Sequence, residues 1–304
     1  RDLVDYARRR LQRQLSQRGG RDESAAIAHS ALDPNVLTLG FARRFTEYKR
    51  PAMLLSQPDR LARLLSDPAN PVQIIIAGKA HPRDEIGRNF VRQWAEFVRR
   101  PAVRARAVFL EDYDMALAEQ LVQGVDVWIN TPRRPWEASG TSGMKVLVNG
   151  GLNLSELDGW WAEAYAPDVG WALGDGREHS EPGWDESETE QLYGILEREV
   201  VPAFYDRDTE GIPRAWVARI RASLSRLTPR FSSNRMLAEY LDRLYLPAAT
   251  DCRRRSADNL HVARELRAWF RELRRHWNAI HWGNLEVTTE GGHPAFRVQV
   301  YLGE

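Results

Sequence analysis

The chain has 304 residues, of which 43% are hydrophobic, and 43 basic residues against 42 acidic residues give a net charge of +1. This length and apolar content allow one large domain, or two unequal ones, with a substantial core. Because the charges are balanced and interspersed, they disfavour a nucleic-acid-binding stripe and a membrane-attracting face, so we expect neither nucleic acid nor a membrane as a partner.

The first half of the chain alternates between helical and strand-like segments. Apolar residues at four-residue spacing predict an amphipathic helix over residues 3–18, and a second short helix is expected over residues 25–31. Short apolar runs that predict buried strands are residues 36–41, 72–77, 105–110 and 125–129, with helical patterns between them. Short apolar strands alternating with helices are typical of a parallel sheet covered on both faces. We therefore expect an α/β fold with a Rossmann-like, doubly wound parallel sheet.

The second half is expected to be mainly helical. Short edge strands are predicted over residues 152–154 and 170–174, and helices over residues 188–204, 214–227 and 234–246. Residues 247–256 have the composition of a linker, and the helix after them places Trp269 and Trp277 at packing positions. A hairpin is expected from residues 285–289 and 296–302.

Features near the two ends of the sequence suggest a piece of a longer protein. The chain begins with Arg1 and ends at Glu304, directly after the predicted hairpin, and an isolated hairpin is marginal in water. We expect residues 1–250 to form the C-terminal catalytic lobe of an enzyme, and residues 251–304 to form a linker helix and the start of a truncated C-terminal β domain. The single Cys252 has no disulfide partner in the chain, which predicts a cytoplasmic location.

Polar segments follow several of the predicted strands. Ligands of doubly wound sheets bind beyond the carboxyl ends of the strands. The segments at those ends are the one carrying Arg43, Arg44 and Lys49, the turn at Gly78 and Lys79, residues 111–113, and residues 137–145. We therefore expect these segments to converge on one ligand site.

Residues 137–145 read EASGTSGMK and precede a helical segment. A loop of small residues leaves backbone N–H groups accessible, and the start of a helix adds a positive end, so this stretch predicts an anion site. Only Lys49, Lys79 and Lys145 are lysines; subtracting these three from the 43 basic residues leaves 40 arginines. A lysine retained in such a chain is a candidate for chemistry that arginine cannot perform, such as forming a Schiff base with an aldehyde.

Four ordered motifs resemble one enzyme family. They are RRFTEYKR at residues 43–50, VFLEDYDMALAEQ at residues 108–120, EASGTSGMK, and LVNGGLNLSELDGWW at residues 147–161. Together they resemble the C-terminal lobe of the α-glucan (glycogen or starch) phosphorylases, particularly the short bacterial and archaeal type. The resemblance covers most of residues 1–250. It implies a retaining, two-lobe B-type glycosyltransferase that uses pyridoxal 5′-phosphate and inorganic phosphate to release α-glucose 1-phosphate from glycogen or maltodextrin.

The resemblance also implies roles for individual residues. Lys145 would hold the cofactor as a Schiff base, and Tyr113 would lie against it. Arg43 would bind the cofactor's phosphate together with the backbone N–H groups of Thr141 and Ser142.

The substrate-binding residues implied by the resemblance form a second set. Arg44 and Lys49 would bind the attacking phosphate, and Glu137, Ser139 and Gly140 would hold hydroxyl groups of the glucosyl unit. Lys145, Arg44 and Lys49 are thus the expected catalytic residues, and no metal site is expected. The missing N-terminal lobe of the same enzyme is an expected partner, so the chain alone is expected to be inactive.

Two other classes of protein are alternatives to this interpretation, and the sequence also departs from the family in its regulatory segments. A nucleotide-sugar-dependent retaining glucosyltransferase of the same architecture often has a second glutamate eight residues after the first, but that position is Lys145. A non-catalytic carbohydrate-binding module would need an exposed aromatic platform and no basic cluster. The regulatory segments of the better-known phosphorylases have no counterpart in this sequence, so allosteric control of that kind is unsupported.

Overall fold

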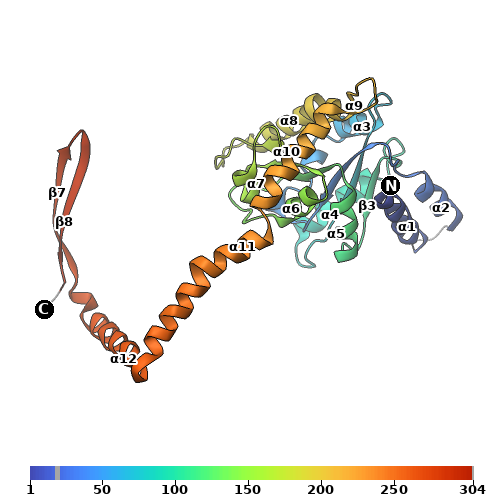
Figure 1. Ribbon diagram of the computed structural model, residues 1–304. Helices are drawn as coiled ribbons and strands as arrows, with labels where there is room; N and C mark the ends of the chain where they lie inside the picture. The colour runs from blue at the N-terminus through green and yellow to red at the C-terminus, as the bar shows by residue number, and fades with distance from the viewer. Residues whose placement is uncertain (18–20, 303–304) are drawn as a thin grey trace. The chain divides into compact units, whose positions relative to one another are not determined.

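The computed structural model describes residues 1–17 and 21–302 (Figure 1). It divides into two compact units, Arg1–Ser232 and Ser233–Glu304. This division falls before the boundary expected after residue 250. The last residue of the predicted first helix, at position 18, and residues 303–304 lie outside the described residues.

A six-stranded parallel sheet forms the centre of the first unit, with the strand order β3-β2-β1-β4-β5-β6. The strands are β1 (Leu37–Ala42), β2 (Val72–Ala77), β3 (Ala107–Leu110), β4 (Val127–Asn130), β5 (Leu152–Glu156) and β6 (Gly170–Leu173). The order runs outward in both directions from β1 and β4, so the topological switch point lies between these two strands. The doubly wound fold is confirmed. The expectation that β5 is an edge strand is wrong, because β5 pairs with both β4 and β6.

Helices cover both faces of the sheet, as Figure 1 shows. One face packs against α1 (Asp2–Ser16), α2 (Arg21–Ser30), α5 (Met115–Gly124) and α6 (Thr141–Val148). The other packs against α3 (Pro58–Ser66), α4 (Glu85–Phe97), α8 (Trp184–Ile195), η3 (Leu196–Val200), α9 (Val201–Tyr205) and part of α10 (Arg214–Arg230). Ile74 and Ile76 of β2 face one core and Ile75 the other, which explains why the strands are continuous apolar runs.

A third, smaller core joins α6 to two further helices. It contains Trp160 and Trp161 of α7 (Gly159–Ala164), packed with Leu147 of α6 and Leu227 of α10. Trp160 and Trp161 are 3% and 0% exposed, so the expectation that they fill the edge of a core is confirmed.

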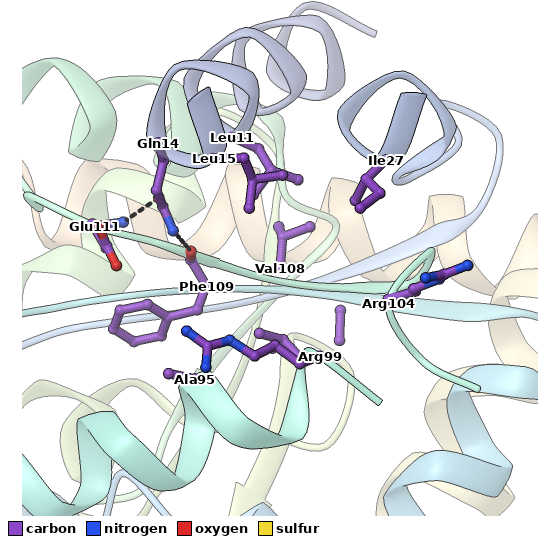
Figure 2. Close-up of a pocket in the computed structure, with 12 residues that line it drawn as sticks. Leu11, Gln14, Leu15, Ile27, Ala95, Arg99, Arg104, Val108, Phe109 and Glu111 are labelled. Carbon is purple, nitrogen blue, oxygen red and sulfur yellow. Dashed lines mark hydrogen bonds between the residues drawn. The ribbon is translucent and has the colours of Figure 1, made fainter. Parts of the chain in front are cut away.

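The exposed edge of β3 is closed by a side chain of α1. The Gln14 side-chain amide donates to the Phe109 carbonyl oxygen over 3.1 Å and accepts from the Glu111 backbone N–H over 3.0 Å, as Figure 2 shows. Gln14 thus occupies the hydrogen-bonding positions that another strand would use, which protects an edge strand from unwanted pairing. Beside it, Leu11, Leu15 and other apolar side chains line a small pocket (Figure 2).

The second unit contains helices and one antiparallel hairpin. Its elements are α11 (Ser233–Tyr240), η4 (Leu241–Tyr245), α12 (Leu246–His276), η5 (Trp277–Ala279), β7 (His281–Glu290) and β8 (His293–Tyr301). The predicted linker over residues 247–256 is helical, which corrects the prediction. Pro247 stands in the first turn of α12, where proline is tolerated, and the following residues include no glycine.

Two further features of this unit differ from what the sequence predicted. The helical conformation of α12 is interrupted at residues 257–260, where Asp258, Asn259 and Leu260 have positive φ angles. Trp269 and Trp277, expected at packing positions, are each 61% exposed, since none of the described hydrophobic residues of this unit is buried. Over the described residues, no helix combines the length and the apolar character that crossing a membrane requires.

Candidate functional site

The segments after β1, β2 and β4 meet at the carboxyl edge of the sheet. The Arg43 backbone N–H donates to the Ala77 carbonyl oxygen over 3.2 Å, and the Phe45 N–H donates to the Lys79 carbonyl oxygen over 2.9 Å, so the chain leaving β1 runs beside the chain leaving β2. This segment ends in a short 3-10 turn, η1 (Glu47–Lys49). The segments after β1 and β2 therefore lie side by side at the carboxyl edge of the sheet.

Glu137 is the centre of a charge cluster at this edge, which we call the rim cluster (Arg43, Lys49 and Glu137). Glu137 Oε2 accepts from Arg43 Nη2 and from Lys49 Nζ, each over 2.5 Å. Burial alone would raise the pKa of the Glu137 carboxyl, but the charge of Arg43 and the hydrogen bond from Lys49 outweigh it and hold that pKa below its ordinary value. The rim cluster therefore contains an ionised carboxylate between two cations.

One N–H donor group of Arg43 is not used within the rim cluster. Its side chain is mostly buried, and burial lowers the pKa of the guanidinium although Glu137 and the nearby tyrosine side chains favour the charge. Among the described residues, the buried Arg43 Nη1 has no hydrogen-bond partner. Tyr113 lies close enough for Arg43 to offset part of the rise that burial causes in the phenol pKa. A buried donor without a partner is costly, so this position favours an anionic ligand.

The start of α6 supplies the second part of the site. Gly140 precedes the helix in the left-handed region, with φ of 83°, and as a glycine has no side chain to accept from the N–H groups of the first turn. Trp128 Nε1 donates to Ser142 Oγ over 3.2 Å, and Asn153 Nδ2 donates to the Gly143 carbonyl oxygen over 3.1 Å. These bonds hold the first turn from the sheet side, and a helix N-terminus of this kind favours negatively charged groups.

Close packing explains the glycine at position 143. A Cβ atom there would lie 2.6 Å from Asn153 Oδ1 and 2.9 Å from Trp160 Nε1. Glycine is therefore required for the first turn of α6 to approach β5 and α7.

The other predicted site residues lie on the same segments but outside the rim cluster. Arg44, Thr141 and Lys145 are exposed, and Ser139 and Gly140 are half-buried. Among the described residues, no ion pair or side-chain hydrogen bond joins Arg44 or Lys145 to another group. The structure thus brings Arg43, Lys49, Glu137 and Tyr113 together, and places the remaining predicted residues around them.

Sequence reasoning missed several residues that hold this arrangement. Asp158 Oδ2 accepts from the Glu137 backbone N–H over 2.8 Å, and Asp158 Oδ1 accepts from the Gly159 N–H over 2.9 Å. Arg50 Nη2 donates to Glu156 Oε2 over 2.9 Å in a separate buried cluster. Arg50, Glu156 and Asp158 all stand inside the motifs quoted above, but nothing in the letters distinguishes a buried charge from an exposed one.

The fold and the rim cluster together describe a doubly wound α/β protein whose charged side chains gather beyond the carboxyl ends of its parallel strands. The chain belongs to the carbohydrate phosphorylase family, whose sequence pattern matches residues 20–166. The resemblance to the short bacterial and archaeal phosphorylases is thereby confirmed.

Individual relatives match over most of the chain. It is 43% identical over 302 residues to a glycogen phosphorylase of Mycobacterium tuberculosis, covering 99% of this chain and 35% of the relative. It is 38% identical over 283 residues to a maltodextrin phosphorylase of Thermococcus litoralis, covering 92% and 33%. A glycogen phosphorylase of Aquifex aeolicus is 46% identical over 214 residues, covering 70% and 31%. The chain therefore spans about a third of the length of these curated relatives.

Proposed function

We propose that this chain is the cofactor- and phosphate-binding lobe of an α-1,4-glucan phosphorylase. The whole enzyme would transfer a glucosyl unit from glycogen or maltodextrin to inorganic phosphate and release α-glucose 1-phosphate with retained configuration. The observation that carries the proposal is the rim cluster, in which a buried N–H group of Arg43 has no partner among the described residues and lies at the edge that also carries the start of α6. Such a site suits a phosphate group.

Pyridoxal 5′-phosphate fits the residues of this edge. The spare donor of Arg43 and the backbone N–H groups of Thr141 and Ser142 would bind its phosphate, Lys145 would carry it covalently, and Tyr113 would lie against it. When bound, the cofactor would supply a phosphate group able to exchange a proton with the substrate phosphate.

The remaining residues would place the substrates. Arg44 and Lys49 would bind inorganic phosphate, and the ionised Glu137 would accept hydrogen bonds from glucosyl hydroxyl groups beside Ser139 and Gly140. Two phosphate groups near one another repel by roughly 4 kcal/mol per charge pair at about 4 Å and an effective dielectric constant of about 20. Several cations and a helix N-terminus at one edge offset this repulsion, which explains why so many donors gather there.

The two alternatives are less consistent with these residues. A nucleotide-sugar transferase would be expected to have a carboxylate where this chain has Lys145. A simple carbohydrate-binding module has no use for a buried carboxylate between two cations, although Trp136, which is 66% exposed and lies 6.2 Å from the Tyr48 ring, offers an aromatic surface beside the rim cluster. The cytoplasmic location expected from the single cysteine stays a prediction.

Covalent labelling tests the proposal. The protein would be incubated with pyridoxal 5′-phosphate, reduced with borohydride and mapped by mass spectrometry; we expect the pyridoxyl group on Lys145. Lys145→Arg should keep the positive charge and lose the label, whereas the control Lys79→Arg should be labelled like the wild type. A label on Lys49 or Lys79 instead, or no stable label at all, would contradict the proposed site.

A further inference from the structure

A second charge cluster lies next to the rim cluster in sequence. We call it the Arg50 cluster (Arg50, Glu156, Asp185 and Glu188). The side chains of Arg50, Glu156 and Glu188 are 7%, 2% and 4% exposed, whereas that of Asp185 is 46% exposed. Arg50 directly follows η1, Glu156 ends β5, and the two other carboxylates belong to α8. The cluster therefore joins three elements behind the turn that presents Lys49.

Every N–H group of the Arg50 guanidinium has a partner. Nε donates to the Thr131 carbonyl oxygen over 3.0 Å, and Nη2 donates to the Pro132 carbonyl oxygen and to Glu156 Oε2, each over 2.9 Å. Nη1 donates to Asp185 Oδ1 over 3.0 Å and to Glu188 Oε2. A guanidinium has five such N–H groups in a fixed plane, so all five donors are used and none remains for a ligand.

The same region ties the backbone of the turn to the loop after β4. The Thr131 hydroxyl group is shared between the carbonyl oxygens of Lys49 and Arg50, at 3.2 Å and 3.3 Å. The Arg133 N–H donates to the Tyr48 carbonyl oxygen over 2.6 Å. Arg50 itself has a left-handed backbone, with φ of 45° and ψ of 53°. A non-glycine residue keeps this conformation only where its surroundings hold it.

The charges of the Arg50 cluster are balanced internally. Burial, followed by the negative charge of Glu188, raises the pKa of Glu156 to about 9, so Glu156 carries a proton near neutral pH. The carboxyl groups of Glu188 and Asp185 face Arg50, and Asp185 Oδ2 also lies 2.5 Å from Arg133 Nη2. The left-handed Gly174 leaves the space for the two glutamates, since a Cβ atom there would overlap Glu156 Oε1. With Arg133 added, two arginines face these carboxyl groups, so the cluster has no excess positive charge to attract phosphate.

We propose that Arg50 is a positioning residue that holds Lys49 Nζ against Glu137 by joining the Lys49 turn and the loop after β4 to β5 and α8. A lysine has a flexible four-carbon stem, so the position of its charge depends on how firmly its backbone is held. The consequence for phosphate binding rests on the proposed function, whereas the placement of Lys49 does not. Loss of Arg50 should therefore free Lys49 first and weaken phosphate binding as a result.

Lysine acetylation measures the first effect directly, because the chain has only three lysines. In the intact protein, Lys49 should react more slowly with an acetylating reagent than the exposed Lys145, since its side chain is 7% exposed. Arg50→Gln should speed acetylation of Lys49 by about tenfold, as expected when local opening becomes easier, without changing Lys79 or Lys145. The matched control is Arg60→Gln, because Arg60 also pairs with α8, through Glu190, but lies outside both clusters.

Thr131→Val provides a milder variant in case Arg50→Gln does not fold. It removes only the hydroxyl group that donates to the turn, and should speed Lys49 acetylation by about threefold, in proportion to the loss of one hydrogen bond. Titration calorimetry with inorganic phosphate on the cofactor-loaded protein measures the second effect, the change in phosphate affinity. Arg50→Gln should weaken phosphate binding by about tenfold, whereas Arg60→Gln should leave it unchanged.

The outcomes separate the two proposals. Faster acetylation of Lys49 together with weaker phosphate binding supports the positioning role. Faster acetylation with unchanged phosphate affinity supports the placement of Lys49 by Arg50 but contradicts the proposed role of Lys49 as a phosphate ligand. An unchanged Lys49 rate, or an equal rise at all three lysines, overturns the inference, because the first shows no coupling and the second shows only general destabilisation.

Discussion

Lys49 and Arg50 are neighbours in the chain, yet they belong to charge clusters of opposite character. In the rim cluster, two cations share one carboxylate oxygen, and Arg43 Nη1 has no partner among the described residues. In the Arg50 cluster, all five guanidinium donors are used. The difference indicates how a binding site can be told from its support: a site keeps unsatisfied donors and excess charge, and a support has neither.

The choice of basic residue matches these two tasks. Arginine presents a planar fork that can bind several oxygens at fixed angles, which suits the contacts of Arg50 with Thr131, Pro132 and Glu156. Lysine is a compact charge that approaches one oxygen closely, as Lys49 does at Glu137. If this comparison is correct, changes in the Arg50 cluster should lower stability and reach phosphate binding only through Lys49, whereas changes at Arg44 and Lys49 should affect phosphate use directly.

The largest expected effect is that of Glu188→Gln on stability. It removes a buried negative charge that faces Arg50 and leaves that cation short of a partner. Breaking a buried pair in this way costs about 3–5 kcal/mol in the free energy of unfolding. Urea denaturation at pH 7 would measure this loss in the free energy of unfolding. A loss below about 1 kcal/mol, the size typical of an exposed pair, would contradict the proposed difference between the two clusters.

A smaller effect of a different kind is expected at the rim. In the full-length enzyme, Arg44→Ala and Lys49→Ala should each lower kcat/KM for phosphate by about 10- to 150-fold, which corresponds to about 1.5–3 kcal/mol for a lost charge-assisted hydrogen bond. The KM for glucan should change little, and steady-state kinetics with each substrate varied in turn would separate the two. Wild-type values for phosphate in both variants would show that neither Arg44 nor Lys49 binds it.

The smallest effect is expected for Glu156→Gln at neutral pH. Since the pKa of Glu156 is raised to about 9, mainly by burial, the native side chain is already protonated and glutamine resembles it. At pH values between 4.5, the ordinary pKa, and about 9, Glu156 holds a proton in the native state that it releases in the unfolded state. The free energy of unfolding therefore falls as the pH rises through this range. One proton contributes at most about 1.4 kcal/mol per pH unit.

Urea denaturation at pH 6, 7 and 8 would test this sign. The wild type should lose more stability than Glu156→Gln over this range, and the two should be similar at the lower pH. A variant whose stability falls as steeply as that of the wild type would show that Glu156 does not hold the extra proton.

The sheet was largely predictable because its strands are short apolar runs that cannot face water. The position of β5 inside the sheet was not predictable from its composition, since it depends on pairing with β4 and β6. The helical character of residues 247–256 was missed because Pro247 was interpreted as an interruption, whereas it stands in the first turn of α12.

By itself, the sequence determined the family, the small-residue loop before Lys145 and the presence of three lysines among 40 arginines, because these depend on residue types and local spacing. Only the tertiary structure decided which charges meet. Glu137 pairs with Arg43 and Lys49 from 94 and 88 residues away, and Arg50 reaches Glu156 and Glu188 across 106 and 138 residues. Such pairs form when the order of the parallel strands brings distant loops to one edge, and burial then decides whether a charge is saturated or left free to bind.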